Sequence, residues 1–305
     1  MAMVIEVEAG IYRIVPEGLD RGILCECYLI VDDQIALIET GATSQVDQII
    51  EGMAKLGYEP TSLSYIIPTH IHADHGGGAG YLAGYAPDAK VIVHEQGARH
   101  LIDPSRLILG TRQTFGDDFE DEFGPLIPVP EHKIFSVQGG ETISLGKRDL
   151  KIIHTPGHAP HHICIYETKS HGLFCGEALG CYMPEYDRLV LAAAPPLFEI
   201  NLALESNQRL KDLYPRVLFF SQWGVSRDAR RLIELSEEYI KACRDIILSG
   251  TKEGETEESI IERLGPYVWK TDMLGEYAKS ESILRIFGTF WVGPYVAYFK
   301  REGLT

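Results

Sequence analysis

The stretch Thr-His-Ile-His-Ala-Asp-His-Gly-Gly-Gly, residues 69–78, places four strong metal-binding side chains within six positions. They are His70, His72, Asp74 and His75, and they follow closely on the apolar run at residues 63–67. Imidazole nitrogens together with a carboxylate form a ligand set that suits zinc, iron or manganese. Solvated loop histidines would not explain the order of strand, glycines and helix, so the pattern predicts a metal site.

The spacing within this motif indicates how one loop can serve two ions. His70 and His72 are two residues apart at the end of a predicted strand, so they can point to one side and chelate one ion. Asp74 and His75 come after the turn and can reach a second ion. The remaining ligands must come from elsewhere in the chain.

Two other positions offer such ligands. His158 ends the sequence Thr-Pro-Gly-His at 155–158, where a Pro-Gly turn after a strand presents the imidazole at a sheet edge. Glu177 comes directly after another predicted strand, and its carboxylate has two oxygens with which it can bridge two metals. Both are therefore candidate ligands.

Composition limits the classes of partner. The 305 residues carry 28 Lys and Arg against 44 Asp and Glu, a formal net charge of -16. A chain this acidic repels nucleic acid and anionic membrane surfaces, so we expect neither as a partner. The sequence contains no apolar run long enough to span a membrane, and we expect no signal peptide. The six cysteines form no C-x-x-C pair, which favours reduced thiols and a cytoplasmic location.

Short apolar runs separated by turns predict sheets covered by helices in the first 225 residues. We expect strands at 10–15, 27–31, 34–38, 63–67, 90–93, 141–145, 150–154, 162–166, 172–175 and 217–221, and helices at 44–56, from 79 onward and at 201–213. The stretch 103–135 contains four prolines and an acidic run, so we expect an irregular segment, either a solvated loop or a lid.

After residue 225 the pattern changes to amphipathic helices, expected at 228–248 and 257–264, followed by an aromatic-rich stretch at 280–299. We therefore expect a metal-binding domain over residues 1–225 and a helical extension over residues 226–305 that packs on the core. The alternatives for the aromatic stretch are the contact of a homodimer and closure over the site.

The motifs resemble those of the metallo-β-lactamase superfamily, which includes glyoxalase II and quorum-quenching lactonases. The matching pieces, in the order of that family and within about residues 1–225, are Glu39-Thr40-Gly41, the histidine motif at 70–75, Thr-Pro-Gly-His at 155–158, Gly176-Glu177 and Ser-Gln-Trp-Gly at 221–224. The resemblance implies an α/β fold, a four-layer αββα sandwich with a dinuclear site at one edge of the sheets. It implies a first metal held by His70, His72 and His158, a second held by Asp74 and His75, and Glu177 as the bridge.

Three positions depart from the family pattern. Glu39 stands where the family has an Asp that orients a histidine ligand, and Glu177 stands where the bridging residue is an Asp. Gln222 aligns with a histidine that is a terminal ligand of the second metal, and glutamine is a weak, neutral oxygen donor. The second site is therefore expected to lack one strong ligand and to be partly occupied.

Four other side chains are candidates for the surroundings of the site. Because no histidine follows position 171, the missing ligand would have to be replaced by His161, His162, His171 or water. We interpret His161 and His162 mainly as groups that support the ligands or line the pocket. Tyr182 is a candidate substrate-binding residue.

These residues predict a metal-dependent hydrolase with two divalent ions, zinc or iron, with manganese as a further candidate. A metal-bound hydroxide would attack a small ester, lactone, thioester or phosphoester, while Asp74 orients this nucleophile and takes its proton. One alternative is a sensor or binding protein with a degraded second site. The other is a diiron oxygen-binding protein, although such relatives typically carry a Glu where this chain has His72.

Overall fold

The computed structural model describes residues 2–17, 25–194, 198–268 and 288–305. Contacts gather the chain into two compact units, each of which is described by itself. Unit 1 comprises Met1–His154, His161–Gly176 and Pro215–Arg227, and unit 2 comprises Thr155–Pro160, Glu177–Tyr214 and Asp228–Thr305. The predicted domain boundary at residue 225 lies near only one of the points where the chain passes between the units, and it stays a prediction.

The first sheet of unit 1 has the strand order β1-β2-β3-β4-β5-β6-β7. Neighbouring strands are antiparallel from β1 to β4 and parallel from β4 to β7. The strands are β1 (Met3–Glu8), β2 (Ile11–Val15), β3 (Cys27–Val31), β4 (Ile35–Ile38), β5 (Leu63–Ile67), β6 (Lys90–His94) and β7 (Ile134–Val137). The parallel half sets the carboxyl ends of β4 and β5 at one edge.

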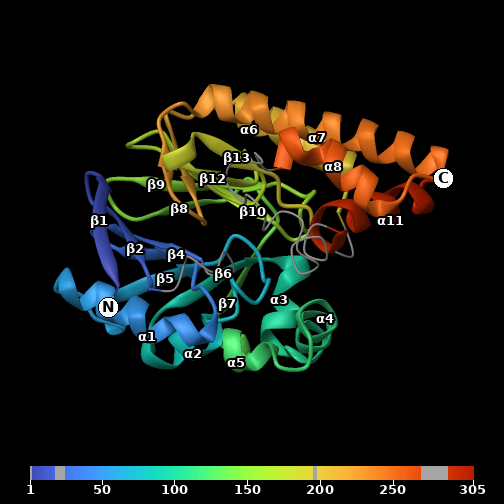
Figure 1. Ribbon diagram of the computed structural model, residues 1–305. Helices are drawn as coiled ribbons and strands as arrows, with labels where there is room; N and C mark the ends of the chain where they lie inside the picture. The colour runs from blue at the N-terminus through green and yellow to red at the C-terminus, as the bar shows by residue number, and fades with distance from the viewer. Residues whose placement is uncertain (1, 18–24, 195–197, 269–287) are drawn as a thin grey trace. The chain divides into compact units, whose positions relative to one another are not determined.

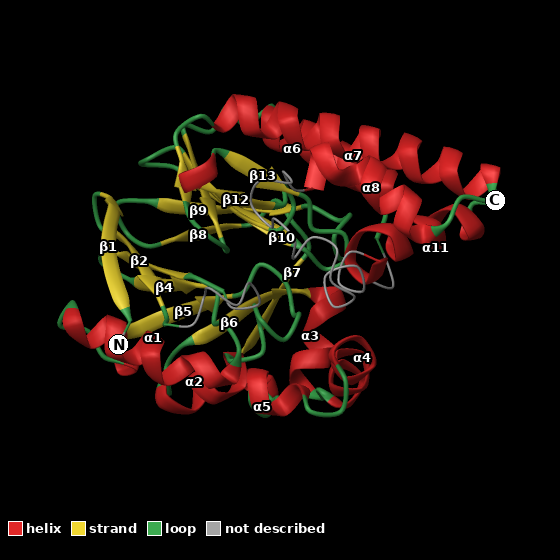
Figure 2. Ribbon diagram, in the orientation of Figure 1, coloured by secondary structure: helices red, strands yellow, loops and turns green. Residues whose placement is uncertain are grey.

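The second sheet of unit 1 has the order β15-β14-β11-β10-β9-β8. Strands β11 and β14 are parallel, and the other neighbours are antiparallel. The strands are β8 (Thr142–Ser144), β9 (Asp149–His154), β10 (Ile163–Glu167), β11 (Gly172–Gly176), β14 (Val217–Phe220) and β15 (Val225–Ser226). Figure 2 shows the two sheets of this unit as separate layers.

The helices of unit 1 are α1 (Val46–Lys55), α2 (Ala79–Tyr85), α3 (Glu95–Ile102), α4 (Ser105–Phe115) and α5 (Phe119–Phe123). Figure 1 shows α1, α2 and α5 along the face of the first sheet that is turned away from the second sheet. Unit 1 therefore has three layers, which are a layer of helices, the first sheet and the second sheet.

Strand β3 is buried on both faces, and the alternation of its side chains decides which core each residue joins. Leu29 joins Ile49 of α1 in the core between the first sheet and the helices. Tyr28 points the other way, into the core between the sheets, where its ring centroid lies 5.3 Å from that of Phe174 and 5.5 Å from that of Phe219. The aromatic trio joins the two sheets.

The stretch 103–135 is not irregular throughout, because it contains α4 and α5, so this expectation was wrong. Pro104 is the residue before α4, and the other prolines follow α5. On α4, Leu107, Thr111 and Phe115 recur every four residues and are buried or half-buried, as in an amphipathic helix. The prolines and the acidic run are typical of loops, and they led to the prediction of an irregular segment despite the helical period of α4. Leu107 and Phe115 pack against the core cluster that contains Phe119 and Phe123 of α5.

Unit 2 consists of a hairpin and helices. Its elements are β12 (Cys181–Met183), β13 (Arg188–Val190), α6 (Ile200–Lys211), α7 (Ala229–Glu253), α8 (Glu257–Val268), a π-helical turn (Gly288–Val292) and α11 (Gly293–Arg301). Helix α7 runs beside α6 and α8 (Figure 2). Its buried Ile240 and Cys243 join Phe198, Tyr295 and Phe299 in one core.

The aromatic-rich stretch is described in part. Residues 280–287, including Phe287, lie outside the described residues. Tyr295 and Phe299 are fully buried in the core of unit 2, so they are packing residues there. Packing of the extension on the domain over residues 1–225 and the homodimer both stay predictions. Among the described residues, no helix combines the length and the apolar composition needed to span a bilayer.

Candidate metal centre

The carboxyl ends of the parallel strands β4 and β5 carry the predicted site. Glu39 follows β4, and its backbone N–H donates to the carbonyl oxygen of Ile67, the last residue of β5, at 3.1 Å. Thr40 holds the histidine loop, because its backbone N–H and its hydroxyl both donate to the His75 carbonyl oxygen, at 3.0 and 2.8 Å. The two strand ends are thus fastened together around the motif.

Close packing explains the glycines that follow His75. A Cβ atom on Gly77 would lie 2.1 Å from the Ala73 carbonyl oxygen, and one on Gly78 would lie 2.8 Å from the Thr40 carbonyl oxygen. Both neighbours are backbone atoms, so a side chain is excluded at these positions. The loop therefore folds back on itself and leads into α2 beside the histidines.

His70 and His72 converge as the sequence spacing suggests. The Nε2 atom of His70 lies 2.9 Å from the Nδ1 atom of His72. His70 is fully buried and His72 is partly buried. The Thr69 hydroxyl lies 3.1 Å from Nδ1 of His70 on the far side of the ring.

His75 lies between two carboxylates. Its Nδ1 atom is 3.2 Å from Oε1 of Glu39, and its Nε2 atom is 3.3 Å from Oδ2 of Asp74. Burial alone lowers the pKa of this imidazole, but the negative charges beside it, those of Asp74 and Glu39 among them, raise it by more, so the pKa of His75 stands well above its usual value. Glu39 holds the Nδ1 side of the ring, which directs Nε2 towards Asp74.

No sequence pattern pointed to Cys25, which the structure places at this site. Its Sγ atom lies 3.6 Å from Nδ1 of His75, and ligand atoms of Cys25, Glu39 and His75 all lie within 4.8 Å of one another. Burial raises the pKa of the Cys25 thiol well above its usual value, so the neutral thiol is favoured. The thiol donates to the Glu26 carbonyl oxygen at 3.3 Å. All six cysteines are free and buried.

His161 and His162 lie against the histidine motif within unit 1. The ring of His162 stacks on that of His70 with a centroid distance of 5.1 Å, and the ring of His161 lies 6.3 Å from that of His70. Both are buried. Whether they support the ligands or line a pocket stays a prediction.

Gln222 is buried in the turn between β14 and β15. Its neighbour Ser221 donates its hydroxyl hydrogen to Oε1 of Glu39 at 2.7 Å, and the Ser221 carbonyl oxygen accepts from the Glu26 backbone N–H at 2.7 Å. Tyr28 donates its hydroxyl hydrogen to the carbonyl oxygen of Phe220 at 2.5 Å. The turn that carries Gln222 is therefore fastened to the carboxylate that contacts His75.

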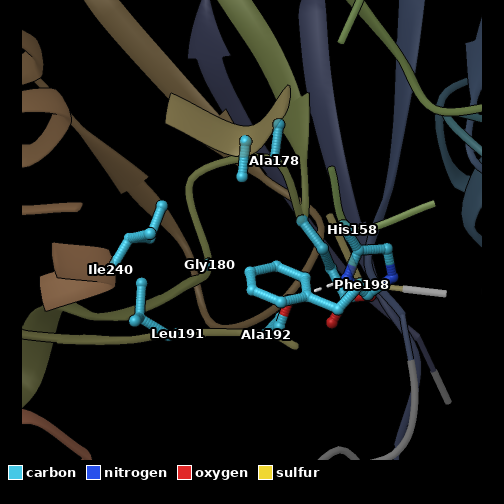
Figure 3. Close-up of a pocket in the computed structure, with 9 residues that line it drawn as sticks. His158, Ala178, Gly180, Leu191, Ala192, Phe198 and Ile240 are labelled. Carbon is cyan, nitrogen blue, oxygen red and sulfur yellow. Dashed lines mark hydrogen bonds and ion pairs between the residues drawn. The ribbon is translucent and has the colours of Figure 1, made fainter. Parts of the chain in front are cut away.

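His158 and Glu177 belong to unit 2, where they form a pair. Nε2 of His158 lies 2.9 Å from Oε2 of Glu177, and Nδ1 of His158 lies 2.8 Å from the Ala192 carbonyl oxygen. The Cys181 thiol donates to Oε1 of Glu177 at 3.6 Å. Figure 3 shows His158 beside the Phe198 ring at a small, mostly apolar pocket of this unit.

The Tyr182 hydroxyl is directed at a carboxylate rather than at an open cavity. It donates to Oδ1 of Asp187 at 2.9 Å, and Asp187 also pairs with Arg231. Both hydrogen bonds lower the pKa of Asp187, that of Arg231 by more. A substrate contact by Tyr182 stays a prediction.

The donor atoms within each unit fit a divalent metal. The Ala192 carbonyl oxygen can only accept, so Nδ1 of His158 carries the hydrogen and a neutral ring directs its Nε2 lone pair at Glu177. Two lone pairs 2.9 Å apart repel each other unless a proton or a metal cation lies between them. In unit 1, the converging nitrogens of His70 and His72 are of the kind that binds zinc or iron.

Comparison with known proteins places the chain in a family. A sequence profile of the metallo-β-lactamase superfamily matches residues 21–238, and the chain belongs to this superfamily. Its members are generally hydrolases, and they typically bind divalent metal ions. The predicted fold class, an α/β metallo-β-lactamase fold with C-terminal helices, is confirmed.

Curated relatives match part of the chain. A metallo-β-lactamase fold-containing protein of Sulfurisphaera tokodaii is 29% identical over 172 residues, which cover 53% of this chain and 61% of that protein. Glyoxylase B2 of Dictyostelium discoideum is 31% identical over 47% of this chain and 43% of its own length. An N-acyl homoserine lactonase of a Bacillus species is 27% identical over 65% of this chain and 69% of its own length. The chain thus spans between 43% and 69% of the length of these curated relatives.

Solved structures share the fold. A metallo-β-lactamase family protein of Thermus thermophilus matches 98% of this chain and 95% of its own with a TM-score of 0.71 at 22% identity. An archaeal superfamily protein from Sulfolobus tokodaii matches 77% of this chain and 86% of its own with a TM-score of 0.64 at 24% identity. At these identities the likeness concerns the fold alone.

Proposed function

We propose that this protein is a metal-dependent hydrolase of a small ester, lactone, thioester or phosphoester. The observation that carries the proposal is the arrangement in unit 1, where His70 and His72 converge and Asp74 and Glu39 flank the two nitrogens of His75. Membership of a superfamily of metal-binding hydrolases supports it.

The proposed ligands are His70, His72 and His158 for one ion and Asp74 and His75 for a second, with Glu177 between the two. A divalent metal bound by these residues supplies a Lewis acid that lowers the pKa of a coordinated water towards neutrality. The carboxylate of Asp74 is proposed to orient the attacking water and to accept its proton. Glu39 holds the His75 ring through Nδ1 and leaves Nε2 for binding.

Chain connectivity supports including Glu177 among these ligands. Glu177 follows Gly176 directly, and a Cβ atom on Gly176 would lie 2.5 Å from Oγ1 of Thr69 and 2.6 Å from Nε2 of His162. One peptide bond therefore separates Glu177 from backbone that is packed on the histidine cluster. His158 is similarly three residues from His161 in the sequence.

The choice among substrate classes has weaker support than the choice of a metal-dependent hydrolase. Two of the similar proteins are described as an N-acyl homoserine lactonase and a glyoxylase, which favours a lactone or an ester-type carbonyl over a phosphoester for this chain. The formal charge of -16 argues against nucleic acid as a substrate. We therefore place small lactones and thioesters first.

Elemental analysis of protein purified without added metal, followed by a hydrolysis panel, tests the proposal. The panel contains an N-acyl homoserine lactone, a glutathione thioester, an aryl ester and an aryl phosphodiester. We expect bound zinc, iron or manganese and turnover of at least one carbonyl substrate. In the His70→Ala variant we expect metal content to fall and turnover to drop at least ~100-fold, because the first ion loses a ligand.

Full metal content in His70→Ala would refute the ligand assignment. Absence of turnover by the wild type after reconstitution with each metal would refute the proposed hydrolase activity.

Gln222 favours one second candidate function, that of a binding or sensor protein with a degraded second metal site. Close to one metal per chain together with tight binding of an unhydrolysed panel compound would support that candidate.

A further inference from the structure

The carboxylate of Glu39 collects hydrogen bonds from two different parts of the histidine motif. Its Oε1 atom accepts from the Thr69 hydroxyl at 2.6 Å and lies 3.2 Å from Nδ1 of His75. Its Oε2 atom accepts from the Thr69 backbone N–H at 3.0 Å. Glu39, Thr69 and His75 are almost wholly shielded from solvent, so these bonds do not compete with bulk water.

The acceptor character of Glu39 settles where the Thr69 hydrogen lies. An ionised carboxylate can only accept, so the Thr69 hydroxyl hydrogen is committed to Glu39. The Thr69 oxygen is then left as an acceptor for the group 3.1 Å away, which is Nδ1 of His70. His70 must therefore carry its hydrogen on Nδ1, which puts the lone pair on Nε2, the nitrogen that faces His72.

The same reasoning applies directly to His75. Its Nδ1 donates to Glu39, so Nε2, which faces Asp74, is the nitrogen left for a second proton or for a metal ion. His70 and His75 belong to the two different ligand groups of the proposed dinuclear centre. Their rings lie 4.1 Å apart between centroids, and one carboxylate sets the hydrogen positions of both.

We propose that Thr69 is a positioning residue that relays the charge of Glu39 to His70, so that a single buried carboxylate selects the metal-binding tautomer of one histidine in each ligand group. The ligand roles rest on the proposed function, whereas the tautomers do not. A purely structural Thr69, serving only to pack and to bond through its backbone, would leave the tautomer of His70 unaffected.

Nitrogen-15 NMR of histidine-labelled, metal-free protein at about pH 8 tests the relay. The ring signals are assigned with His70→Gln and His75→Gln. In the wild type we expect both rings to carry hydrogen on Nδ1. In Thr69→Val, which keeps the shape of the side chain and removes its oxygen, we expect the His70 signals to move towards the other tautomer while those of His75 stay. Thr69→Ser keeps the oxygen and should keep the wild-type pattern.

Ser221→Ala is the matched control. Ser221 also donates to Oε1 of Glu39, at 2.7 Å, but its hydroxyl is bonded to the carboxylate and not placed between the carboxylate and His70 as Thr69 is. Its removal should leave the His70 tautomer unchanged. Hydrogen on Nε2 of His70 in the wild type, or an unchanged Nδ1–H pattern in Thr69→Val, would overturn the proposal. The wild-type spectrum alone decides the case if Thr69→Val does not fold.

Zinc titration supplies a second readout. Loss of groups that orient metal ligands commonly weakens metal affinity about 10–100-fold, which we expect for Thr69→Val, with most of the affinity restored in Thr69→Ser. Equal affinity in Thr69→Val and the wild type would contradict the relay. Failure of the wild type itself to bind metal would refute the proposed function and leave the NMR result to stand on its own.

Discussion

Glu39 is held in a backbone conformation that few non-glycine residues adopt. Its φ angle is 64°, in the left-handed region, which costs a non-glycine residue on the order of 1 kcal/mol or more. The buried hydrogen bonds from Thr69, Ser221 and His75 offset this cost. The strained residue is therefore the one on which the proposed relay depends, and its longer side chain still reaches His75.

Gln222 is the residue whose change should alter the metal count. It follows Ser221, which is bonded to Glu39 at 2.7 Å. Imidazole is a much stronger donor to zinc than a neutral amide. We expect Gln222→His to raise the occupancy of the second metal and the rate of hydrolysis, measured by elemental analysis and by turnover of the same panel compound.

Gln222→Ala is the control for that substitution, because it removes the amide without supplying a donor. It should lower the second-metal occupancy or leave it unchanged. If Gln222→His has the same metal content and turnover as the wild type, the alignment of this position with a metal ligand is wrong.

At the scale of elements, helix α2 carries two glycines with opposite surroundings. A Cβ atom on Gly80 would lie 1.9 Å from the Ile127 carbonyl oxygen, whereas a Cβ atom on Gly84 would have nothing within 4 Å. Neither glycine has a positive φ angle. The first glycine therefore lets the segment after α5 approach the helix, and the second has no packing role.

This contrast predicts opposite effects of the same substitution. Gly80→Ala should lower the free energy of unfolding by about 1–3 kcal/mol or more, because the clash is with backbone. Gly84→Ala should raise it by up to about 1 kcal/mol, because alanine is the better helix former. Denaturant titration of both variants measures the difference. Equal effects of the two would show that the segment after α5 does not pack on α2 in this way.

At the scale of the whole molecule, the proposed ligands come from distant parts of the sequence, from His70 to Glu177. An ion that binds the native chain and not the unfolded one stabilises it by about 2.7 kcal/mol at a free concentration 100 times the Kd. For a chain of this size, this corresponds to an increase in Tm of roughly 4 °C.

We therefore expect chelation to lower Tm by roughly that amount and added zinc to restore it, as measured by scanning calorimetry. His70→Ala should show a smaller difference between chelated and zinc-loaded protein, because it lacks a ligand of the first ion. If the wild type is shown to contain metal and its Tm does not change on chelation, the bound ion does not stabilise the folded state.

Much of unit 1 could be predicted because its elements have local signatures. The apolar runs of β3 to β6 and the period of α1 mark these elements directly in the sequence. Helices α4 and α5 were missed, because the prolines that flank them and the acidic run that includes part of α5 are typical of loops, and only the packed face of α4 shows the helical period. The close approach of Cys25 to His75 had no signature at all.

The sequence by itself was enough to propose a set of metal ligands, because the histidine motif, Thr-Pro-Gly-His at 155–158 and Glu177 are stretches whose chemistry is readable residue by residue. The sequence motifs also predicted membership of the superfamily, and the profile match confirms this prediction. Only the tertiary structure decided that Cys25, Thr69 and Ser221 meet at Glu39. The physical reason is that strand pairing and core packing bring these residues to Glu39 across 14 to 182 positions of sequence, and a local sequence pattern does not reveal such contacts.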